Sequence, residues 1–234
     1  MLVLALSTST PRGSVALVRD GEVLGRAVHS ELRAHAERLF AGIDEVCARA
    51  GVLRRQIELV ACDVGPGSFT GVRVAVAAAM GISISLDVPA VGVASVEAMA
   101  AAALAGAPVG ARALAALDAQ KDELFIGDYQ LDPSGALREV TSIVAMTRSA
   151  AAPHLARVMQ LGHLVVGAGT ALAGVEASIS TEAVTLPDAA FVAHLAVLRA
   201  SAALRHVSLE PVYVRPPDIT LSGPVAHRPT GPSV

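Results

Sequence analysis

One seven-residue segment combines residue types that can cradle an anion. Gly65-Pro66-Gly67-Ser68-Phe69-Thr70-Gly71 lies between an apolar run and a run of helical character. Glycines let the backbone turn sharply, and the start of a helix leaves several N–H groups unpaired and aimed at an anion. No Gly-Lys-Ser/Thr follows, and the glycine spacing differs from the dinucleotide-binding fingerprint. The segment therefore predicts either a phosphate site or the commoner structural elbow between a strand and a helix.

The other residues that could do chemistry form weaker patterns. The 7 histidines include no pair at i, i+4 spacing, so no helical metal pair is predicted. A Ser/His/Asp triad stays open, although no Gly-x-Ser-x-Gly segment is present. Asp118, Lys121, Asp122 and Glu123 could form an acid–base cluster, but they straddle an expected turn between strands, where solvated side chains are commoner. We predict neither catalytic residues nor metal ligands.

The elements that would position the elbow follow from the pattern of apolar residues. Three antiparallel strands are expected at 2–6, 14–19 and 22–28, because Asp20-Gly21 is typical of a two-residue type I′ hairpin. Periodicity predicts helices at 35–50, from the elbow to 86, and at 95–104. Further strands are expected at 57–64 and 89–93.

The second half of the chain begins in the same way as the first. Strands are expected at 113–117, 124–131 and 136–144, followed by a helix from 189 to about 204 and an extended segment at 210–215. Two successive meanders suggest an internal duplication. The Gly/Pro/Ala-rich stretch 106–110 marks the boundary between the lobes. We expect an N-terminal lobe at 1–109, a C-terminal lobe at 110–215 whose last helix can pack back on the first, and a mobile Pro-rich tail at 216–234.

Composition excludes several classes of protein. The 234 residues are 53% apolar and 17% charged, with a net charge of −3, and neither half is basic, so strong nucleic-acid binding is not predicted. The apolar run at 74–86 is shorter than the roughly 20 residues that cross a bilayer, and the N-terminus lacks the basic region of a secretory signal. With two distant cysteines, we expect a cytoplasmic protein without a membrane span.

Several motifs carry a resemblance to a known family. They are the Ser-Thr end of the first strand, the elbow continuing through Val72-Arg73, and Val91-Gly92-Val93 before a helix, together with His35-Ala36-Glu37-Arg38-Leu39, Leu117-Asp118-Ala119-Gln120 and Glu210-Pro211-Val212-Tyr213-Val214-Arg215. Together they resemble the TsaB (YeaZ) family of the actin-like/Hsp70/sugar-kinase superfamily, over about residues 2–215. The resemblance implies an α/β fold of two lobes, each with a mixed sheet flanked by helices.

The resemblance also implies a function. TsaB proteins are non-catalytic partners of TsaD, which transfers a threonylcarbamoyl group onto the adenosine beside the anticodon of tRNAs reading codons that begin with A. We therefore expect a dimerising subunit that binds and activates a TsaD-like catalytic subunit, with a TsaE-like ATPase in the assembly. Alone, the chain is expected to form a homodimer. Contact with tRNA is expected to be indirect or weak, and no cofactor is implied beyond weak or vestigial nucleotide binding.

Departures from related enzymes bear on catalysis. The resemblance implies a vestigial nucleotide or anion cleft at Ser7, Thr8, Gly65, Gly67 and Ser68, but Ser7 stands where the family usually has an Asp that helps to hold Mg²⁺. In TsaD-like proteins two histidines after the fifth strand hold a metal. Ser95 and Met99 stand at those positions here, and a hydroxyl and a thioether cannot hold iron or zinc at ordinary affinity.

One helix carries a pattern suited to binding a partner. On the expected helix ending at 86, Ala77, Gly81 and Ser85 form a stripe of small residues on which a second helix could pack closely. That helix could belong to this chain or to another subunit. Related proteins pair through this helix and the 35–50 helix, which implies a partner interface at His35, Arg38, Leu39, Ala77, Gly81 and Ser85.

Three alternatives remain open. The chain could be a small-molecule or sugar kinase of the same superfamily, with the elbow cradling phosphate, although Ser7 counts against this. It could be a glycoprotease-like peptidase, which needs a metal pair or nucleophile that the sequence does not offer. It could also be a homodimer without another physiological partner.

Overall fold

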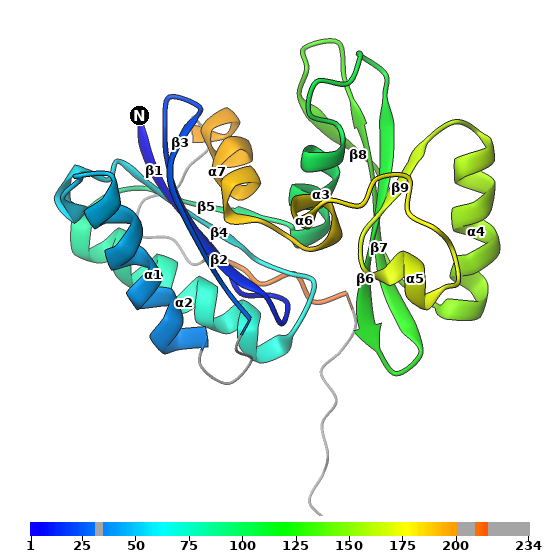
Figure 1. The fold of residues 1–234 in the computed structure, drawn as a ribbon, viewed down its shortest axis with the longest axis horizontal. Helices are drawn as coiled ribbons and strands as arrows, with labels where there is room; N and C mark the ends of the chain where they lie inside the picture. The colour runs from blue at the N-terminus through cyan, green and yellow to red at the C-terminus, as the bar shows by residue number, and fades with distance from the viewer. Residues whose placement is uncertain (31–34, 201–208, 215–234) are drawn as a thin grey trace, which may run out of the picture.

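The structure is a computed structural model, and it describes residues 1–30, 35–200 and 209–214 of the chain. These form two lobes, each built on one sheet (Figure 1). The first half contains β1 (Leu2–Ser7), β2 (Gly13–Arg19), β3 (Glu22–His29), α1 (His35–Arg49), the 3-10 turn η1 (Arg54–Gln56), β4 (Leu59–Asp63), α2 (Phe69–Leu86), β5 (Ala90–Val93) and α3 (Ser95–Ala103). The second half contains β6 (Arg112–Gln120), β7 (Glu123–Leu131), β8 (Leu137–Thr147), α4 (Arg148–Gln160), β9 (Leu164–Val166), α5 (Gly169–Leu172), α6 (Glu182–Thr185) and α7 (Ala189–Leu198).

The N-terminal sheet has the strand order β3-β2-β1-β4-β5. The hairpin between β2 and β3 turns at Asp20 and Gly21, whose φ angles of 51° and 87° confirm the predicted type of turn. The next strands, β4 and β5, run parallel to β1, with Leu6 beside Cys62. Helices α1 and α2 cover one face of this sheet, and α7 covers the other (Figure 1).

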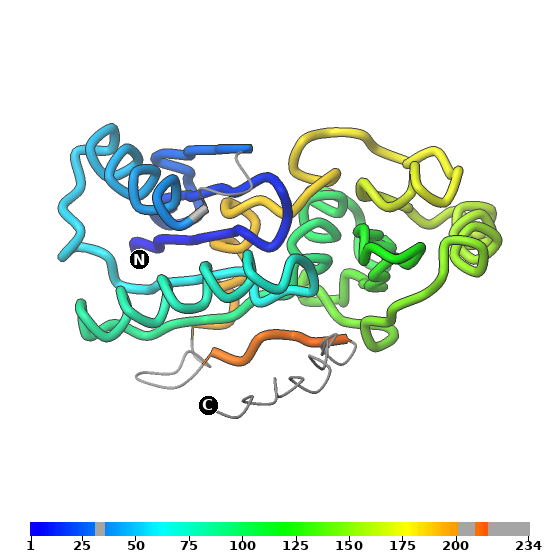
Figure 2. The backbone as a smooth tube through the Cα atoms, turned by 90° about the horizontal axis from the view of Figure 1, so that it is seen from below, coloured from blue at the N-terminus to red at the C-terminus, as the bar shows by residue number. Residues whose placement is uncertain are grey.

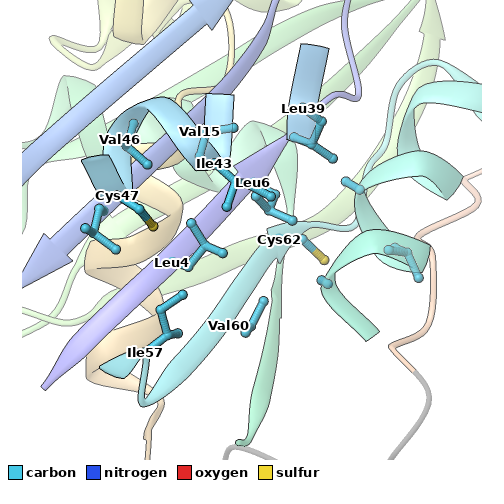
Figure 3. Packing of buried hydrophobic residues seen from close by; sticks show 14 of the residues in the cluster. Leu4, Leu6, Val15, Leu39, Ile43, Val46, Cys47, Ile57, Val60 and Cys62 are labelled. Atoms are coloured by element: carbon cyan, nitrogen blue, oxygen red, sulfur yellow. The ribbon is translucent and has the colours of Figure 1, made fainter. Parts of the chain in front are cut away.

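The core beneath α1 follows the predicted helical spacing. Leu39, Ile43 and Val46 are buried against Leu4 and other side chains of the sheet (Figure 3). Because these three residues recur every three or four positions, they share one face of the helix. The opposite face of α1 carries the exposed residues, so the helix has one side committed to the core.

The second sheet repeats the arrangement of the first. Its order is β8-β7-β6-β9, in which β6 is antiparallel to β7 and parallel to β9, as β1 is to β2 and β4. This agrees with the predicted duplication. The expected helix beyond residue 200 and the tail at 216–234 lie outside the described residues.

The two lobes exchange helices, although each sheet is built from one half of the chain. α3 comes from the first half but packs on β6 and β7, while α7 comes from the second half and packs on β1 and β2. A buried carboxylate, Glu97 of α3, pairs with Arg199 at the end of α7. Arg12, also buried, donates to the carbonyl oxygens of Glu182 and Leu186, at 2.8 and 2.7 Å. These contacts fix the lobes to each other.

Helix α2 has a length and composition that would allow it to cross a membrane. Core helices of soluble proteins share this property, and 39% of the apolar stretch is buried here. The apolar run in the sequence begins after Arg73. The helix itself begins earlier, at Phe69, as expected for a helix that starts at the elbow. Its buried side packs on β4 and β1, so α2 is part of the N-terminal lobe.

Candidate functional site

A buried polar cluster lies where β1 and β4 end side by side. Ser7 and Ser9 both donate from Oγ to Oδ2 of Asp63, the latter over 2.7 Å. Ser95, at the start of α3, donates to Ser9 Oγ over 2.9 Å. The other carboxylate oxygen, Asp63 Oδ1, has no hydrogen-bond partner among the described residues. The cluster therefore joins three segments of the chain around one acid.

The surroundings of Asp63 favour its neutral form. Burial raises the pKa of this carboxyl group to about 6, while hydrogen bonds from Ser7 and Ser9 partly oppose the shift. The sequence analysis did not single out Asp63. In the sequence it appears only as an acidic residue at the end of an apolar strand, two residues before Gly65. The role of Asp63 becomes visible once β1 lies beside β4, because this pairing brings Ser7 and Ser9 to the carboxylate.

The glycine-rich elbow packs against the loop that follows β1. A Cβ on Gly67 would lie 2.2 Å from the carbonyl oxygen of Ser9, and one on Gly71 would lie 1.9 Å from that of Thr8. The Ser68 amide donates to the same Ser9 oxygen over 2.7 Å. Glycine is thus required because two backbones approach closely.

The five residues expected in a vestigial nucleotide cleft lie at the end of β1 and in the elbow, where the hydroxyls of Ser7, Thr8 and Ser68 bond to neighbouring parts of the chain. Ser7 and Thr8 are fully buried, and Thr8 Oγ1 donates to the carbonyl oxygen of Gly71 over 2.7 Å. Ser68 Oγ accepts the Gly71 amide and caps α2. Gly65 has a φ of 92°, which an L side chain rarely adopts. This geometry is that of a structural elbow.

The residues at the metal positions of TsaD-like proteins have other contacts. Ser95 is bound into the polar cluster, Met99 lies in the hydrophobic core, and Glu97 is paired with Arg199. Within residues 1–30, 35–200 and 209–214, no group of three or more His, Cys, Asp or Glu side chains could hold a metal ion. The donor set therefore does not fit the iron or zinc site of those enzymes.

The acidic residues around the β6–β7 turn form no acid–base site. Asp118 accepts from the Gln120 amide over 2.9 Å and pairs with Arg148 at 3.4 Å. Lys121 and Asp122 are exposed and have positive φ angles. The solvated turn predicted as the commoner arrangement is confirmed.

An apolar groove lies between α1 and α2 on the outer surface of the N-terminal lobe. It has a volume of about 300 Å³ and is lined by Phe40 and Ile43 of α1 and by Ala77, Gly81 and Ser85 of α2, among others. The small-residue stripe is exposed, and a Cβ on Gly81 would meet nothing within 4 Å. In the described part of the chain, therefore, no helix covers this stripe.

Three further residues of the expected interface lie on α1. Arg38 is exposed, whereas the side chain of His35 lies outside the described residues. Leu39 is fully buried in the core. The prediction that Leu39 touches a partner is wrong, because the hydrophobic pattern places it on the face of α1 that packs against the sheet.

Comparison with known proteins identifies the family. The family model for TsaD, the tRNA N6-adenosine threonylcarbamoyltransferase, matches residues 22–185. TsaB of Escherichia coli, a tRNA threonylcarbamoyladenosine biosynthesis protein, is 37% identical over 139 residues, or 58% of this chain and 58% of that protein. This chain belongs to the TsaB (YeaZ) family. It shares its fold of two lobes with that family.

Other TsaB relatives agree with this assignment. TsaB of Haemophilus influenzae is 35% identical over 127 residues, or 53% of this chain and 52% of that protein. The chain thus spans about half the length of the curated relatives that it matches. YeaZ from Pseudomonas aeruginosa superposes with a TM-score of 0.74 at 29% identity, over 91% of this chain and 99% of that one. The likeness to TsaB therefore includes both lobes. The TsaB relatives named here are tRNA threonylcarbamoyladenosine biosynthesis proteins.

Proposed function

We propose that this chain is a non-catalytic subunit that binds and activates a TsaD-like catalytic subunit in the threonylcarbamoyl modification of tRNA. The observation that carries the proposal is the uncovered apolar groove between α1 and α2. Contiguous exposed apolar surface marks an interaction site in soluble proteins. The proposal places the chain in the cytoplasm with tRNA and includes a TsaE-like ATPase in the assembly.

The groove suits a helix of another subunit. The row of small side chains at Ala77, Gly81 and Ser85 leaves room for a close approach, and Phe40 and Ile84 stand exposed beside it. Such a surface can also pair with a second copy of the chain, so the proposal includes a homodimer when the partner is absent. Activation requires only that the chain binds the active arrangement of its partner more tightly. Such coupling is typically about 1–3 kcal/mol.

The polar cluster supports a non-catalytic role for this chain. In the kinase alternative, the elbow and the end of β1 would hold phosphate. Here Ser7 and Thr8 are fully buried and bound to Asp63 and Gly71, and the elbow glycines touch backbone. The peptidase alternative needs a metal pair or an activated nucleophile, and the donors at Ser95 and Met99 do not fit a metal pair.

The proposal is tested by measuring binding between the purified chain and the TsaD-like subunit of the same organism by calorimetry. The variant Gly81→Leu fills the groove without meeting any atom of its own chain within 4 Å at Cβ. The control Ala150→Leu enlarges an exposed residue of α4 on the other lobe. We expect micromolar or tighter binding by the wild type and by Ala150→Leu, and a loss of at least about tenfold for Gly81→Leu.

Two outcomes would count against the proposal in different ways. If the wild-type chain does not bind the TsaD-like subunit, the proposed partner is wrong. If it binds and Gly81→Leu binds equally well, the partner stands but the groove is not the interface. Unfolding curves of both variants check that the lobes remain folded.

A further inference from the structure

Exposed aromatic side chains concentrate on one part of the molecule. The chain has only 4 Phe and 2 Tyr. Three of these six are exposed among the described residues: Phe40 at 47%, Phe69 at 44% and Tyr213 at 48%. Phe40 lines the groove, while Phe69 begins α2 and Tyr213 lies in the extended segment 209–214 that runs beside α2 (Figure 2). Exposed aromatic rings are unusual away from binding surfaces, where they serve as anchors.

Phe69 and Tyr213 form one cluster with Arg73. The Arg73 guanidinium lies 3.7 Å from the centroid of the Phe69 ring, and its Nε donates to the Tyr213 hydroxyl over 3.3 Å. The two rings are tilted, with centroids 5.7 Å apart. Both rings also line a second cavity of about 440 Å³, between the elbow, the β6–β7 turn and residues 212–214.

This cluster continues the surface that the proposed interface uses. Phe69 and Arg73 precede Ala77, Gly81 and Ser85 at steps of four residues on α2, so all five belong to one ridge of the helix. Arg73 is the only charged residue of α2. In the described part of the chain, no carboxylate pairs with its guanidinium. The guanidinium carbon lies over the Phe69 ring, and the hydrogen bond that the structure gives to Tyr213 uses Nε rather than the terminal nitrogens.

We propose that Phe69, Arg73 and Tyr213 form a second anchor of the partner interface, where Arg73 binds a carboxylate on the partner protein. The proposal rests on the proposed function and extends it. A stacked guanidinium is held in one orientation, and its planar set of donors matches a carboxylate in a bidentate contact. An apolar side chain beside that carboxylate would lie on Phe69 and Tyr213 at the edge of the second cavity.

A protein carboxylate fits this place better than a nucleic-acid phosphate does. Phosphate backbones are bound by clusters of basic residues, and here a single arginine is flanked by two rings and a helix without another charge. The net charge of −3 also opposes polyanion binding.

The test compares charge reversal at two exposed arginines. Arg73→Glu reverses the charge in the cluster, and Arg138→Glu makes the same change on β8 of the other lobe. Arg73→Lys keeps the charge but loses the planar fork. Calorimetric affinity for the TsaD-like subunit is measured for each, with Gly81→Leu as a separate arm and at low and high salt. We expect Arg73→Glu to weaken binding at least about tenfold, Arg73→Lys less, and Arg138→Glu less than about twofold. The wild-type affinity should fall with salt more steeply than that of Arg73→Glu.

Hydrogen exchange separates a direct contact from loosening of the segment 209–214. The Val212 amide donates to the Val64 carbonyl oxygen over 2.7 Å and reports whether the segment stays in place. We expect its exchange rate to be unchanged in Arg73→Glu. Faster exchange together with weaker binding would overturn the contact in favour of a structural role.

The remaining outcomes also decide between the proposals. If Gly81→Leu abolishes binding while Arg73→Glu matches Arg138→Glu, the second anchor is wrong and the proposed function stands. If the wild-type chain shows no affinity for the TsaD-like subunit, the proposed function itself fails. Binding of tRNA alone that Arg73→Glu removes would replace the carboxylate by a phosphate and overturn this inference.

Discussion

The two lobes share a sheet arrangement but differ in what they place on it. In both, three antiparallel strands and a fourth strand parallel to the first follow the order 3-2-1-4, and a glycine turn follows the fourth strand. In the N-terminal lobe that turn leads into α2, with 18 residues. In the C-terminal lobe it leads into α5, with 4 residues. Among the described residues, the first lobe therefore pairs two long helices, α1 and α2, which form the groove. The second lobe has the short helix α5 at the place of α2.

Polarity also differs between the lobes. The end of β4 carries the buried Asp63, bound by the hydroxyls of Ser7 and Ser9. The corresponding end of β9 carries Val166 and Gly167, next to Ala116 of β6. Exposed large apolar side chains on the second lobe are scattered over separate segments, as Val144 of β8 and Leu172 of α5 illustrate. The N-terminal lobe thus combines the polar junction with the groove of the proposed interface.

The largest effect is expected where the elbow closes on β1. Gly71→Ala places a Cβ 1.9 Å from the Thr8 carbonyl oxygen, whereas Gly169→Ala in the second lobe meets the nearest backbone atom at 2.8 Å. We expect Gly71→Ala to lower the free energy of unfolding by about 3 kcal/mol or more, and Gly169→Ala by about 1–2 kcal/mol. Urea unfolding measures both. A loss below about 1 kcal/mol for Gly71→Ala would show that the elbow is not closed.

The next largest effect is a dependence of the free energy of unfolding on pH, which arises from Asp63 in the polar junction of the N-terminal lobe. A pKa of about 6 for Asp63, against an ordinary 3.8, means that ionisation costs the folded state about 3 kcal/mol. The cost is absent well below pH 3.8, where the acid is neutral in both states. It develops as the pH rises from 3.8 to about 6 and is fully present above 6. Asp63→Asn avoids it. Relative to wild type, this variant should therefore gain about 2 kcal/mol between pH 4 and pH 8 in urea unfolding. A difference that does not change with pH would contradict the shifted pKa.

The smallest effect compares two helical glycines of the N-terminal lobe. Gly81→Ala adds a methyl group in open space, so better helix propensity should raise the free energy of unfolding by up to about 1 kcal/mol. Gly42→Ala in α1 meets Val15 Cγ2 at 3.2 Å and should gain less or lose stability. Thermal unfolding of both variants measures the difference. Destabilisation by Gly81→Ala would mean that the stripe is covered within the monomer.

Local pattern was enough to predict the strands β1 to β8 and the helices α1, α2, α3 and α7, but it did not place β9, α4, α5 or α6. Asp20-Gly21 specified its hairpin, and the spacing of Leu39, Ile43 and Val46 specified the buried face of α1. The same spacing already implied that Leu39 points inward, but the family resemblance suggested a partner contact instead.

Features that depend on distant segments could not be predicted in the same way. Asp63 gained its role only when β1 lay beside β4, since its partners are more than 50 residues away in sequence. The packing of α3 on the second sheet and of α7 on the first sheet depends on contacts with distant strands. Similarly, Arg73 and Tyr213 are 140 residues apart, so their contact has no local signature.

The central claim is that the groove of the N-terminal lobe activates a TsaD-like enzyme. The most direct measurement is threonylcarbamoyl transfer to tRNA by the purified TsaD-like subunit and TsaE-like ATPase, with wild-type chain, with Gly81→Leu, and with no chain. We predict product with the wild type, and at least about tenfold less product with Gly81→Leu or without the chain. Equal product with and without the chain would contradict the account.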